Sequence, residues 1–220
     1  MRALRADFYA RPVLEVAPDL IGCTVEHRGS AGVIVETEAY HESEPASHAF
    51  AGLTLRTATL FGEPGRAYIY RSYGIHALLN AVCEPEGVGS GVLIRALLPV
   101  SGIERMRARR GLIGGRPPRE EDLCSGPGKL TQALGVTLSQ NATSLVSGPI
   151  RIHARAGDWR DPEVLAGTRI GISRAVELPW RFCASGSPYV SRPRPPGSRP
   201  PGLTPAGQRP GAKPPVSRRG

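Results

Sequence analysis

Two glutamates separated by one residue are the first candidates for chemistry. The segment 32–40 reads Gly-Val-Ile-Val-Glu-Thr-Glu-Ala-Tyr, and as a β-strand it would place Glu36, Glu38 and Tyr40 on one face. A carboxylate in a partly apolar site can have a raised pKa and act as a general base. Glu36 and Glu38 are therefore candidate bases, and the competing interpretation is a solvated strand face.

Tyrosine is concentrated in one short segment. Three of the six tyrosines, Tyr68, Tyr70 and Tyr73, fall within six positions, and Gly74 follows directly. As a strand, this segment would carry Tyr68 and Tyr70 on one face. Arg71 and Tyr73 would lie on the other face, before a turn at the glycine. Such rings can stack on a nucleobase or wedge between base steps, although tyrosine also simply favours strands.

These two segments, in this order, resemble segments of the alkyladenine (3-methyladenine) DNA glycosylase family. The resemblance covers nearly all of residues 1–192 and leaves out the remainder. The matching motifs are Phe8, Asp19–Gly22, Val35–Tyr40, Pro45–His48, Phe61–Gly65, Tyr68–Tyr70, Tyr73–Gly74, Asn80, Val92–Leu97, Ser125–Leu130, Arg169–Ile172 and Pro179–Phe182. So many motifs in the family's order would not arise by chance.

The resemblance implies a catalytic pair. Glu38 matches the residue that activates the attacking water, and Arg95 matches the arginine that helps to hold this water. The implied reaction hydrolyses the N-glycosidic bond of a damaged purine that has been flipped out of the duplex. Glycosylases that also nick DNA commonly use an amine nucleophile. Since Lys129 is the only lysine before residue 193 and lies away from Glu38 in sequence, no lyase activity is expected.

A base pocket also follows from the resemblance. Tyr40, His48 and Tyr70 match the walls that sandwich the flipped purine. Asn80 matches the pocket residue that disfavours the exocyclic amine of guanine. Tyr73 matches the side chain that is inserted into the DNA in place of the purine.

Arg71 and Lys129 are further candidates, for contacts with the DNA backbone. The chain departs from the family pattern at Thr57, where Asn is common, and at Ala77 and Leu78, where aromatic residues or Cys are common. These departures bear on the local loop shape and on the substrate range.

The elements that must position these residues are mostly short. Closely spaced strand-like runs without regular intervening helices predict a single α+β domain with a largely antiparallel sheet. The predicted strands are 21–27, 32–40, 67–73, 91–100, 149–154 and 169–176, and the predicted helices are 16–20, 103–110 and 129–134. The resemblance adds that the sheet is curved, that short helices flank it and that a β-hairpin enters the DNA minor groove.

The charge divides the chain in two. Its 220 residues carry a net charge of +9, from 28 Lys and Arg against 19 Asp and Glu. Residues 193–220 contain nine prolines, five glycines, six basic residues and no acid, which predicts a disordered basic tail. Residues 1–192, the predicted catalytic domain, keep a net charge of only +3. Excess arginine favours a polyanion, here double-stranded DNA with damaged purines, unless it only reflects a GC-rich genome.

Signals for a metal, a cofactor or a membrane are missing from the sequence. The four cysteines form no Cys-x-x-Cys pair and the histidines show no ligand spacing, so no metal and no cofactor are expected. No apolar run approaches the roughly 20 residues of a membrane span, and the N-terminus lacks the apolar core of a secretory signal. We expect a monomeric, cytoplasmic protein associated with the nucleoid.

The leading hypothesis is a monofunctional DNA glycosylase for alkylated and deaminated purines that starts base excision repair. One alternative is a catalytically inactive nucleic-acid-binding module of the same fold, which would show salt-sensitive binding without base release. Another is a sugar glycosidase built on Glu36 and Glu38. That enzyme would lack a tryptophan-rich sugar platform and would leave Tyr73 unexplained.

Overall fold

Strands β2 (Ser30–His41) and β5 (Ser90–Ser101) form the centre of the fold and pair antiparallel along almost their whole length. The computed structural model describes residues 2–157 and 162–194. Within these residues there is one antiparallel sheet of eight strands, in the order β3-β4-β5-β2-β1-β6, with β8 paired to both β2 and β7. The predicted α+β class with a largely antiparallel sheet is confirmed.

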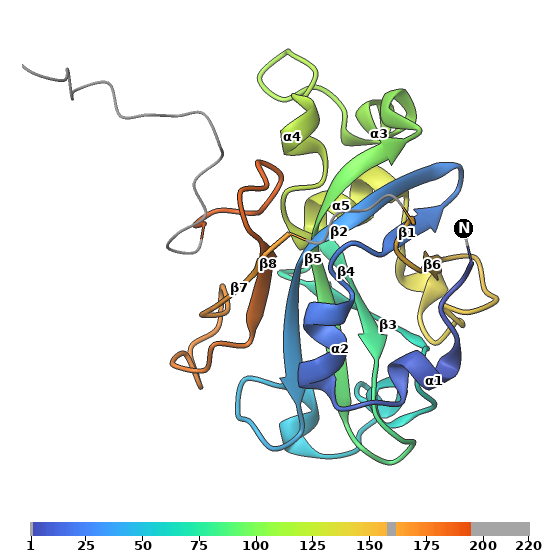
Figure 1. The fold of residues 1–220 in the computed structure, drawn as a ribbon, viewed down its shortest axis with the longest axis vertical. Helices are drawn as coiled ribbons and strands as arrows, with labels where there is room; N and C mark the ends of the chain where they lie inside the picture. Colours follow the sequence, from blue (N-terminus) through green and yellow to red (C-terminus); the bar gives the residue numbers. More distant parts are fainter. Residues whose placement is uncertain (1, 158–161, 195–220) are drawn as a thin grey trace, which may run out of the picture.

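The helices are short and pack on this sheet instead of alternating regularly with its strands (Figure 1). The other strands are β1 (Thr24–His27), β3 (Ala67–Ser72), β4 (His76–Val82), β6 (Arg151–His153), β7 (Val164–Gly167) and β8 (Arg181–Ala184). The α-helices are α1 (Ala6–Tyr9), α2 (Val13–Asp19), α3 (Ile103–Arg110), α4 (Glu120–Leu123) and α5 (Pro127–Leu134). The 3-10 helices are η1 (His48–Ala51), η2 (Ala58–Phe61) and η3 (Leu138–Gln140).

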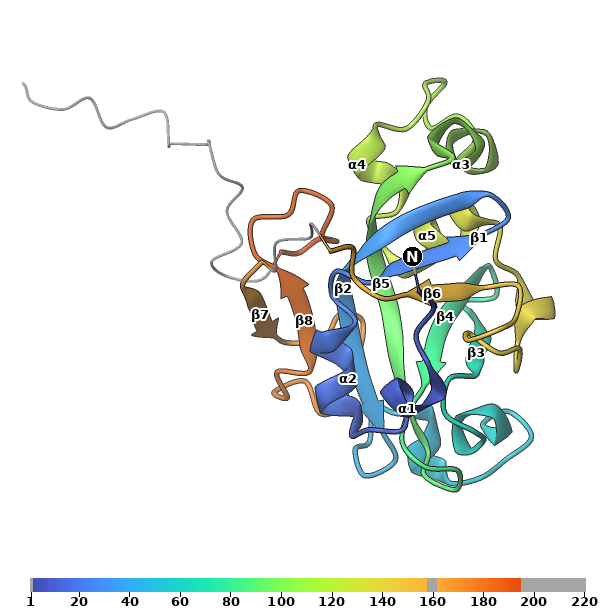
Figure 2. The ribbon, with the colours of Figure 1, turned by 45° about the vertical axis from the view of Figure 1, so that its right-hand side comes forward.

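The sheet curls because β2 changes its second partner along its length. The first part of β2 pairs with β1, whereas its residues from Glu36 to Glu38 pair with β8. Figures 1 and 2 show β7 and β8 diverging from β1 and β6 on this side of β2. The middle of β2 therefore lies where the sheet divides, and side chains from several strands converge there.

Both central strands contain a bulge at this division. In the pairing of these two strands, Val35 on β2 and Arg95 on β5 have no partner on the opposite strand, so each strand carries one extra residue there. A bulge bends its strand and re-aims a side chain. Arg95 thus departs from the strict alternation of β5, and its guanidinium reaches both Glu36 and Glu38.

Helix α2 covers one face of the central strands through a regular apolar stripe. Val13, Val16, Ala17 and Leu20 are all buried, at the spacing typical of an amphipathic helix. The hydroxyl of Thr37 on β2 donates to the carbonyl of Ala17 at 2.8 Å. Because neighbouring strand residues alternate, the glutamates on either side of this threonine point to the opposite face.

Helix α5 supports the hairpin formed by β3 and β4. Its buried face contains Leu130, Ala133 and Leu134. The hydroxyl of Thr131 donates to the carbonyl of Ala77, near the start of β4, at 2.6 Å. The start of β4, directly after the hairpin turn, is therefore fixed to a helix.

Helix α3 is attached to the turn between β1 and β2 by its arginines. Arg105 donates to the carbonyl of Gly29 at 2.7 Å, and Arg109 donates to the carbonyl of Arg28 at 3.2 Å. Gly102, which precedes the helix, has a left-handed backbone with φ of 69°. A Cβ there would lie 2.3 Å from the carbonyl oxygen of Gly29. The close approach of α3 to this turn thus requires a glycine.

One predicted strand is wrong. Residues 169–176 form bends and turns, because Gly171 and Ala175 have φ of 76° and 47°, which an extended strand cannot contain. The strands of this region are β7 and β8, on either side. The strand β4 was also not predicted, since its first residues are rich in Ala and Leu, which do not favour strands.

The predicted division of the chain is not tested by the fold. The proposed tail, 193–220, lies outside the described residues except for Pro193 and Arg194. Among the helices of the described residues, none has the length and the apolar composition needed to cross a membrane.

Replacing Gly102 with Ala should destabilise the fold more than replacing Gly135 with Ala. Both glycines flank helices in the left-handed conformation, which costs an L-residue roughly 1–2 kcal/mol. The nearest atoms to a Cβ at Gly135 belong to the flexible side chain of Arg109, at 3.2 Å, whereas a Cβ at Gly102 would collide with backbone. The free energy of unfolding, measured by urea titration of both variants, checks this; equal losses would contradict it.

Candidate active site

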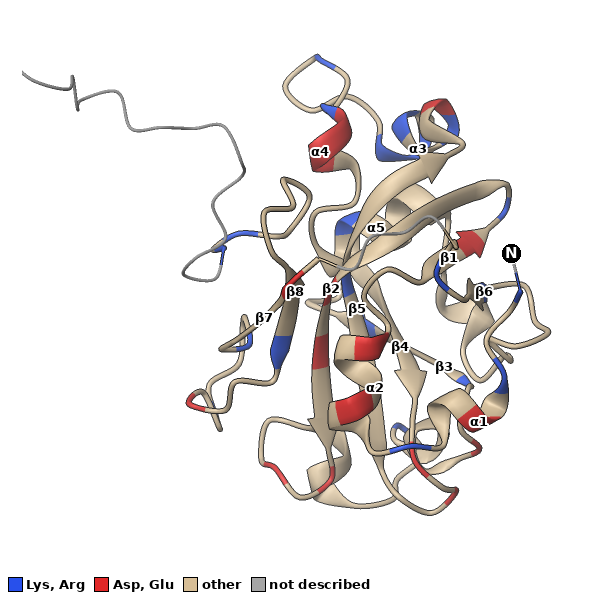
Figure 3. Cartoon of the chain, in the orientation of Figure 1, with Lys and Arg blue, Asp and Glu red and all other residues tan. Residues whose placement is uncertain are grey.

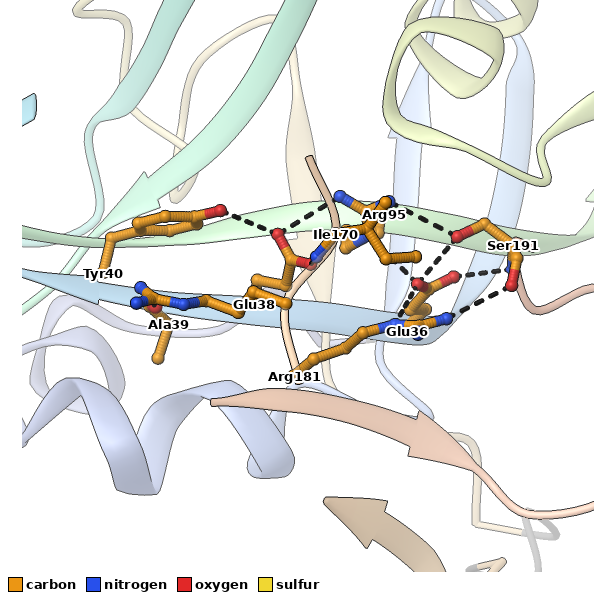
Figure 4. A network of polar contacts seen from close by, with 9 residues as sticks. Glu36, Glu38, Ala39, Tyr40, Arg95, Ile170, Arg181 and Ser191 are labelled. Atoms are coloured by element: carbon orange, nitrogen blue, oxygen red, sulfur yellow. Dashed lines mark hydrogen bonds and ion pairs between the residues drawn. The ribbon is translucent and has the colours of Figure 1, made fainter. Parts of the chain in front are cut away.

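The carboxylate of Glu38 lies in the middle of a buried polar network (Figure 4). Its Oε2 accepts hydrogen bonds from the Tyr40 hydroxyl at 2.8 Å and from Arg95 Nη1 at 3.2 Å. Its Oε1 accepts the backbone N–H of Ile170 at 2.7 Å. These donors come from β2 itself, from β5 and from the loop between β7 and β8, so the site forms only when three segments meet.

The environment of Glu38 suits a general base. The residue is 0% exposed, and burial, together with the charge of Glu36, raises its pKa more than Arg95, the Ile170 N–H and the Tyr40 hydroxyl lower it. A carboxylate has about four acceptor sites, and three donors occupy this one, which leaves a site on Oε1. A desolvated carboxylate with a raised pKa and a vacant acceptor site can take a proton from water.

Glu36 has a different environment. Arg95 Nε, Arg181 Nε and both the N–H and the hydroxyl of Ser191 donate to its carboxylate, at distances between 2.7 and 3.0 Å. Burial disfavours its charged form, but these arginines and the Ser191 donors outweigh burial and hold its pKa below the ordinary value. Figure 3 shows the acidic middle of β2 beside a basic position on β8. Of the two candidate bases, only Glu38 can readily accept a proton.

A pocket of about 800 Å³ opens in front of this network. Tyr40, Arg95 and Ile170, the three donors to Glu38, all line it, so the carboxylate lies directly behind the pocket wall. The volume is within the range of small-ligand sites. A ligand in the pocket would therefore lie next to the groups that hold the base.

The predicted site residues are brought together around this pocket. The lining includes every residue predicted to contact the base or the DNA: Tyr40, His48, Tyr70, Arg71, Tyr73, Asn80 and Lys129. The basic residues of the lining are Arg56, Arg71, Arg95, Lys129 and Arg174, and none of its described residues is an Asp or Glu. The pocket is therefore electropositive at its surface, with its negative charge hidden behind the wall.

Three rings form one aromatic wall. Tyr68 and Tyr70 are stacked with centroids 5.5 Å apart, which agrees with their predicted common face. His48 meets Tyr70 edge to face at 4.6 Å and its Nδ1 lies 3.1 Å from the Tyr68 hydroxyl. His48 and Tyr70 therefore support each other on the same side of the pocket.

The protonation of His48 follows from Arg56, whose Nη2 lies 3.2 Å from His48 Nε2. A guanidinium can only donate, so Nε2 accepts and Nδ1 carries the proton that is donated to the Tyr68 hydroxyl. Burial and the charge of Arg56 both lower the pKa of His48. The wall thus presents a neutral imidazole.

The side chains of Tyr40 and Asn80 are each fixed by a neighbouring group. The Arg169 guanidinium lies over the Tyr40 ring at 4.7 Å and is itself paired with Glu44 at 2.6 and 2.9 Å. Asn80 Nδ2 donates to the carbonyl of Tyr68 at 3.1 Å, and the residue is 6% exposed. The amide is thereby fixed, and its carbonyl end remains as an acceptor.

The hairpin of β3 and β4 carries Tyr73 at its tip. Tyr73 is 87% exposed and has φ of 49°, and Gly74 after it has φ of 70°. A bulky residue in the left-handed region is strained, and such strain is typical of functional positions. Arg71 Nη1 donates to the carbonyl of Gly74 at 3.3 Å and braces the turn. The ring therefore projects from the tip of the hairpin at the rim of the pocket.

Lys129 lies in the first turn of α5, where its Nζ is 3.4 Å from the Ser125 hydroxyl. It lines both the main pocket and a neighbouring one of about 390 Å³. Its ammonium group forms no hydrogen bond or ion pair with Glu38.

Four contributors were not identified from the sequence: Arg56, Ile170, Arg181 and Ser191. Ile170 acts through its backbone N–H, which has no side-chain signature. Arg181 belongs to a matching motif, but nothing in the sequence indicates that it pairs with Glu36. Ser191 follows the last matching motif, so only its three-dimensional contacts reveal it.

The three departures from the family pattern are accommodated. Thr57 is 3% exposed, and its hydroxyl donates to the carbonyl of Gly52 at 2.9 Å and accepts the N–H of Thr54 at 2.8 Å. The loop before η2 is thus closed by this threonine. Leu78 lines the pocket, and Ala77 contributes its carbonyl to α5.

Within the part of the chain that the structure describes, no cluster of three or more His, Cys, Asp or Glu side chains could hold a metal ion. All four cysteines are buried.

Comparison with known proteins agrees with the sequence motifs. The family model described as methylpurine-DNA glycosylase matches residues 7–188. The chain is 56% identical over 190 residues to a protein of Rhodopseudomonas palustris (strain BisB18), covering 86% of this chain and 91% of that protein. It is 46% identical over 194 residues to a protein of Methanoculleus marisnigri, covering 86% and 98%. Both relatives are provisionally named 3-methyladenine DNA glycosylases. The chain belongs to the methylpurine-DNA glycosylase family.

Proposed function

We propose that the protein is a monofunctional DNA glycosylase that flips alkylated and deaminated purines out of duplex DNA and hydrolyses their N-glycosidic bond. The observation that carries this proposal is the buried carboxylate of Glu38 directly behind an electropositive, aromatic pocket. Family membership supports the general activity, and the geometry supports the assignment of roles.

In the proposed reaction, a water molecule occupies the vacant acceptor site of Glu38. Its oxygen attacks C1′ of the sugar, and Glu38 takes its proton. The bond between C1′ and the purine nitrogen breaks, and its electron pair leaves with the base. Arg95 holds Glu38 in place and helps to position the water. Alkylation makes the purine electron-poor, which improves it as a leaving group.

The pocket would select the purine by stacking and by shape. Tyr40 on one side and His48 with Tyr70 on the other would hold the flipped base between aromatic faces. Asn80, whose amide is held by the carbonyl of Tyr68, would disfavour the exocyclic amine of guanine, as the family resemblance implies. Tyr73 would enter the minor groove with the hairpin and fill the gap left by the base.

The cations at the rim suit the DNA backbone. Arg71 and Lys129 would contact phosphates beside the flipped nucleotide. Lys129 is the only lysine among the described residues and does not contact the carboxylate network, so an amine-based lyase step is not expected.

The structure favours this function over the alternatives. A two-carboxylate sugar glycosidase needs a second working carboxyl group, and Glu36 is fully occupied by four donors. A module that only binds DNA gains nothing from a desolvated carboxylate behind its pocket. We further propose that residues 1–192 are the catalytic domain, that 193–220 are an accessory tail, and that the enzyme acts as a monomer on cellular DNA, at the nucleoid in the cytoplasm.

Replacing Glu38 with Gln should slow base release by roughly 10²–10⁴-fold, because an amide cannot accept the proton of water. The measurement is single-turnover release of hypoxanthine from a duplex that contains one deoxyinosine. Glu86→Gln, which neutralises an exposed carboxylate away from the pocket, is the matched control. Full activity of the Glu38 variant would overturn its assignment as base.

Replacing Tyr73 with Ala should weaken excision, because the gap in the duplex is no longer filled. Loss of a stacking ring costs roughly 1–3 kcal/mol, so the rate should fall several-fold or more. Tyr73→Phe should keep most of the activity, since the hydroxyl is not needed for stacking. Excision rates of both variants on the same duplex check this, and equal rates for Ala and wild type would refute the insertion.

Deleting residues 193–220 should weaken salt-dependent DNA association while excision survives. The deletion removes six basic residues and no acid, so the slope of log affinity against log salt should become less steep. Binding of undamaged duplex at several salt concentrations measures this slope. If the shortened protein cannot excise even at low salt, the tail belongs to the catalytic machinery.

A further inference from the structure

Ser191 occupies a place that none of the motifs accounts for. After β8 the chain returns to the central strands, where Ser191 is 4% exposed. Its N–H and hydroxyl donate to the two oxygens of Glu36 at 2.7 and 2.8 Å, and its carbonyl accepts from Arg181 at 3.2 Å. Arg95 Nη2 lies 3.4 Å from the same hydroxyl. Figure 4 shows these contacts on the side of Arg95 away from Tyr40.

These contacts fix the orientation of a planar group. Arg95 Nε donates to Glu36 at 3.0 Å, and Nη2 is directed to the Ser191 hydroxyl. A guanidinium is rigid and flat, so two anchored nitrogens determine where the third one points. The third, Nη1, points to Glu38 Oε2 at 3.2 Å.

We propose that Ser191 is a positioning residue for the reaction, which holds Arg95, directly and through Glu36, in the orientation that directs its Nη1 at Glu38. This inference rests on the proposed function, and it extends the working site to the last residues of the catalytic domain. Ser191 does not line the main pocket; it lines the neighbouring pocket of about 390 Å³ together with Arg95, so we place its effect on the reaction in the orientation of Arg95.

The backbone around Ser191 has anchors of its own. Val190 is 2% exposed, and the Tyr189 hydroxyl donates to Glu120 at 3.2 Å. The Ser191 N–H to Glu36 would also persist in an alanine variant. Removing the hydroxyl should therefore leave the segment docked while it loosens Arg95.

Several groups determine the charge of Glu38. Arg95 faces it from β5, Tyr40 and Glu36 from β2, and the Ile170 N–H from the loop after β7. Tyr70 on β3 and Cys183 on β8 also interact with it electrostatically. Of these groups, Arg95 is the one cation, so a less well directed guanidinium should raise the pKa of Glu38 further.

The test compares Ser191→Ala and Ser191→Thr with the wild-type full chain. Single-turnover release of hypoxanthine from a duplex with one deoxyinosine is measured across a range of pH. Ser191→Ala should slow the reaction roughly tenfold or more, and should move the acid limb of the profile to higher pH. Ser191→Thr, which restores a hydroxyl, should recover both the rate and the profile.

Ser187→Ala is the matched control, because it removes a hydroxyl from the same segment that accepts only the N–H of Tyr189. It should behave as wild type. The affinity of each variant for a duplex with a tetrahydrofuran abasic site should be unchanged. An unaltered rate for Ser191→Ala, or a slower rate with an unmoved acid limb, would reject the proposal.

A carbon-13 NMR titration of the Glu38 carboxyl separates this inference from the proposed function. The signal is assigned by its loss in Glu38→Gln. If the wild type releases no base, the proposed function fails, and the titration alone decides the role of Ser191. A higher Glu38 pKa in Ser191→Ala supports positioning, and identical pKa values in both proteins exclude it.

Discussion

The structure depends on one arginine buried between two carboxylates. Arg95 has 6% of its surface exposed and Glu36 and Glu38 have none. Burying three charges is costly, and removing one partner of such a group leaves an uncompensated charge. The cost is offset by donors from distant parts of the chain, which include Arg181, Ile170 and Ser191. The curl of the sheet brings these donors together.

The network places its two glutamates in different environments. Glu36 receives enough donors to stay charged, whereas Glu38 is left with a raised pKa and an open acceptor site. The paired bulges of β2 and β5 make this division possible, because they aim Arg95 at both carboxylates at once. Without the bulges, the side chain of Arg95 would simply follow the regular alternation of side chains along β5.

Part of the site could be predicted from the spacing of residues along two strands, whereas His48, Asn80 and Arg95 were expected only from the resemblance to the glycosylase family. Period-two alternation correctly placed Glu36, Glu38 and Tyr40 together, and Tyr68 beside Tyr70. The contributions of Ile170 and Ser191 could not be predicted, since one acts through its backbone and the other meets Glu36 across 155 positions. The strand expected at 169–176 does not form. The side chain of Arg169 pairs with Glu44, and residues with positive φ follow it, which the sequence pattern did not indicate.

The long return of the chain to Ser191 has a consequence for biosynthesis. Glu36 emerges early during translation, whereas Arg181 and Ser191, which donate hydrogen bonds to its carboxylate, are made about 150 residues later. Contacts between positions so far apart in the sequence also form slowly. Until they form, a nascent chain carries an arginine and two carboxylates without their full set of partners. A nascent polypeptide that does not yet include Ser191 therefore cannot assemble the complete network.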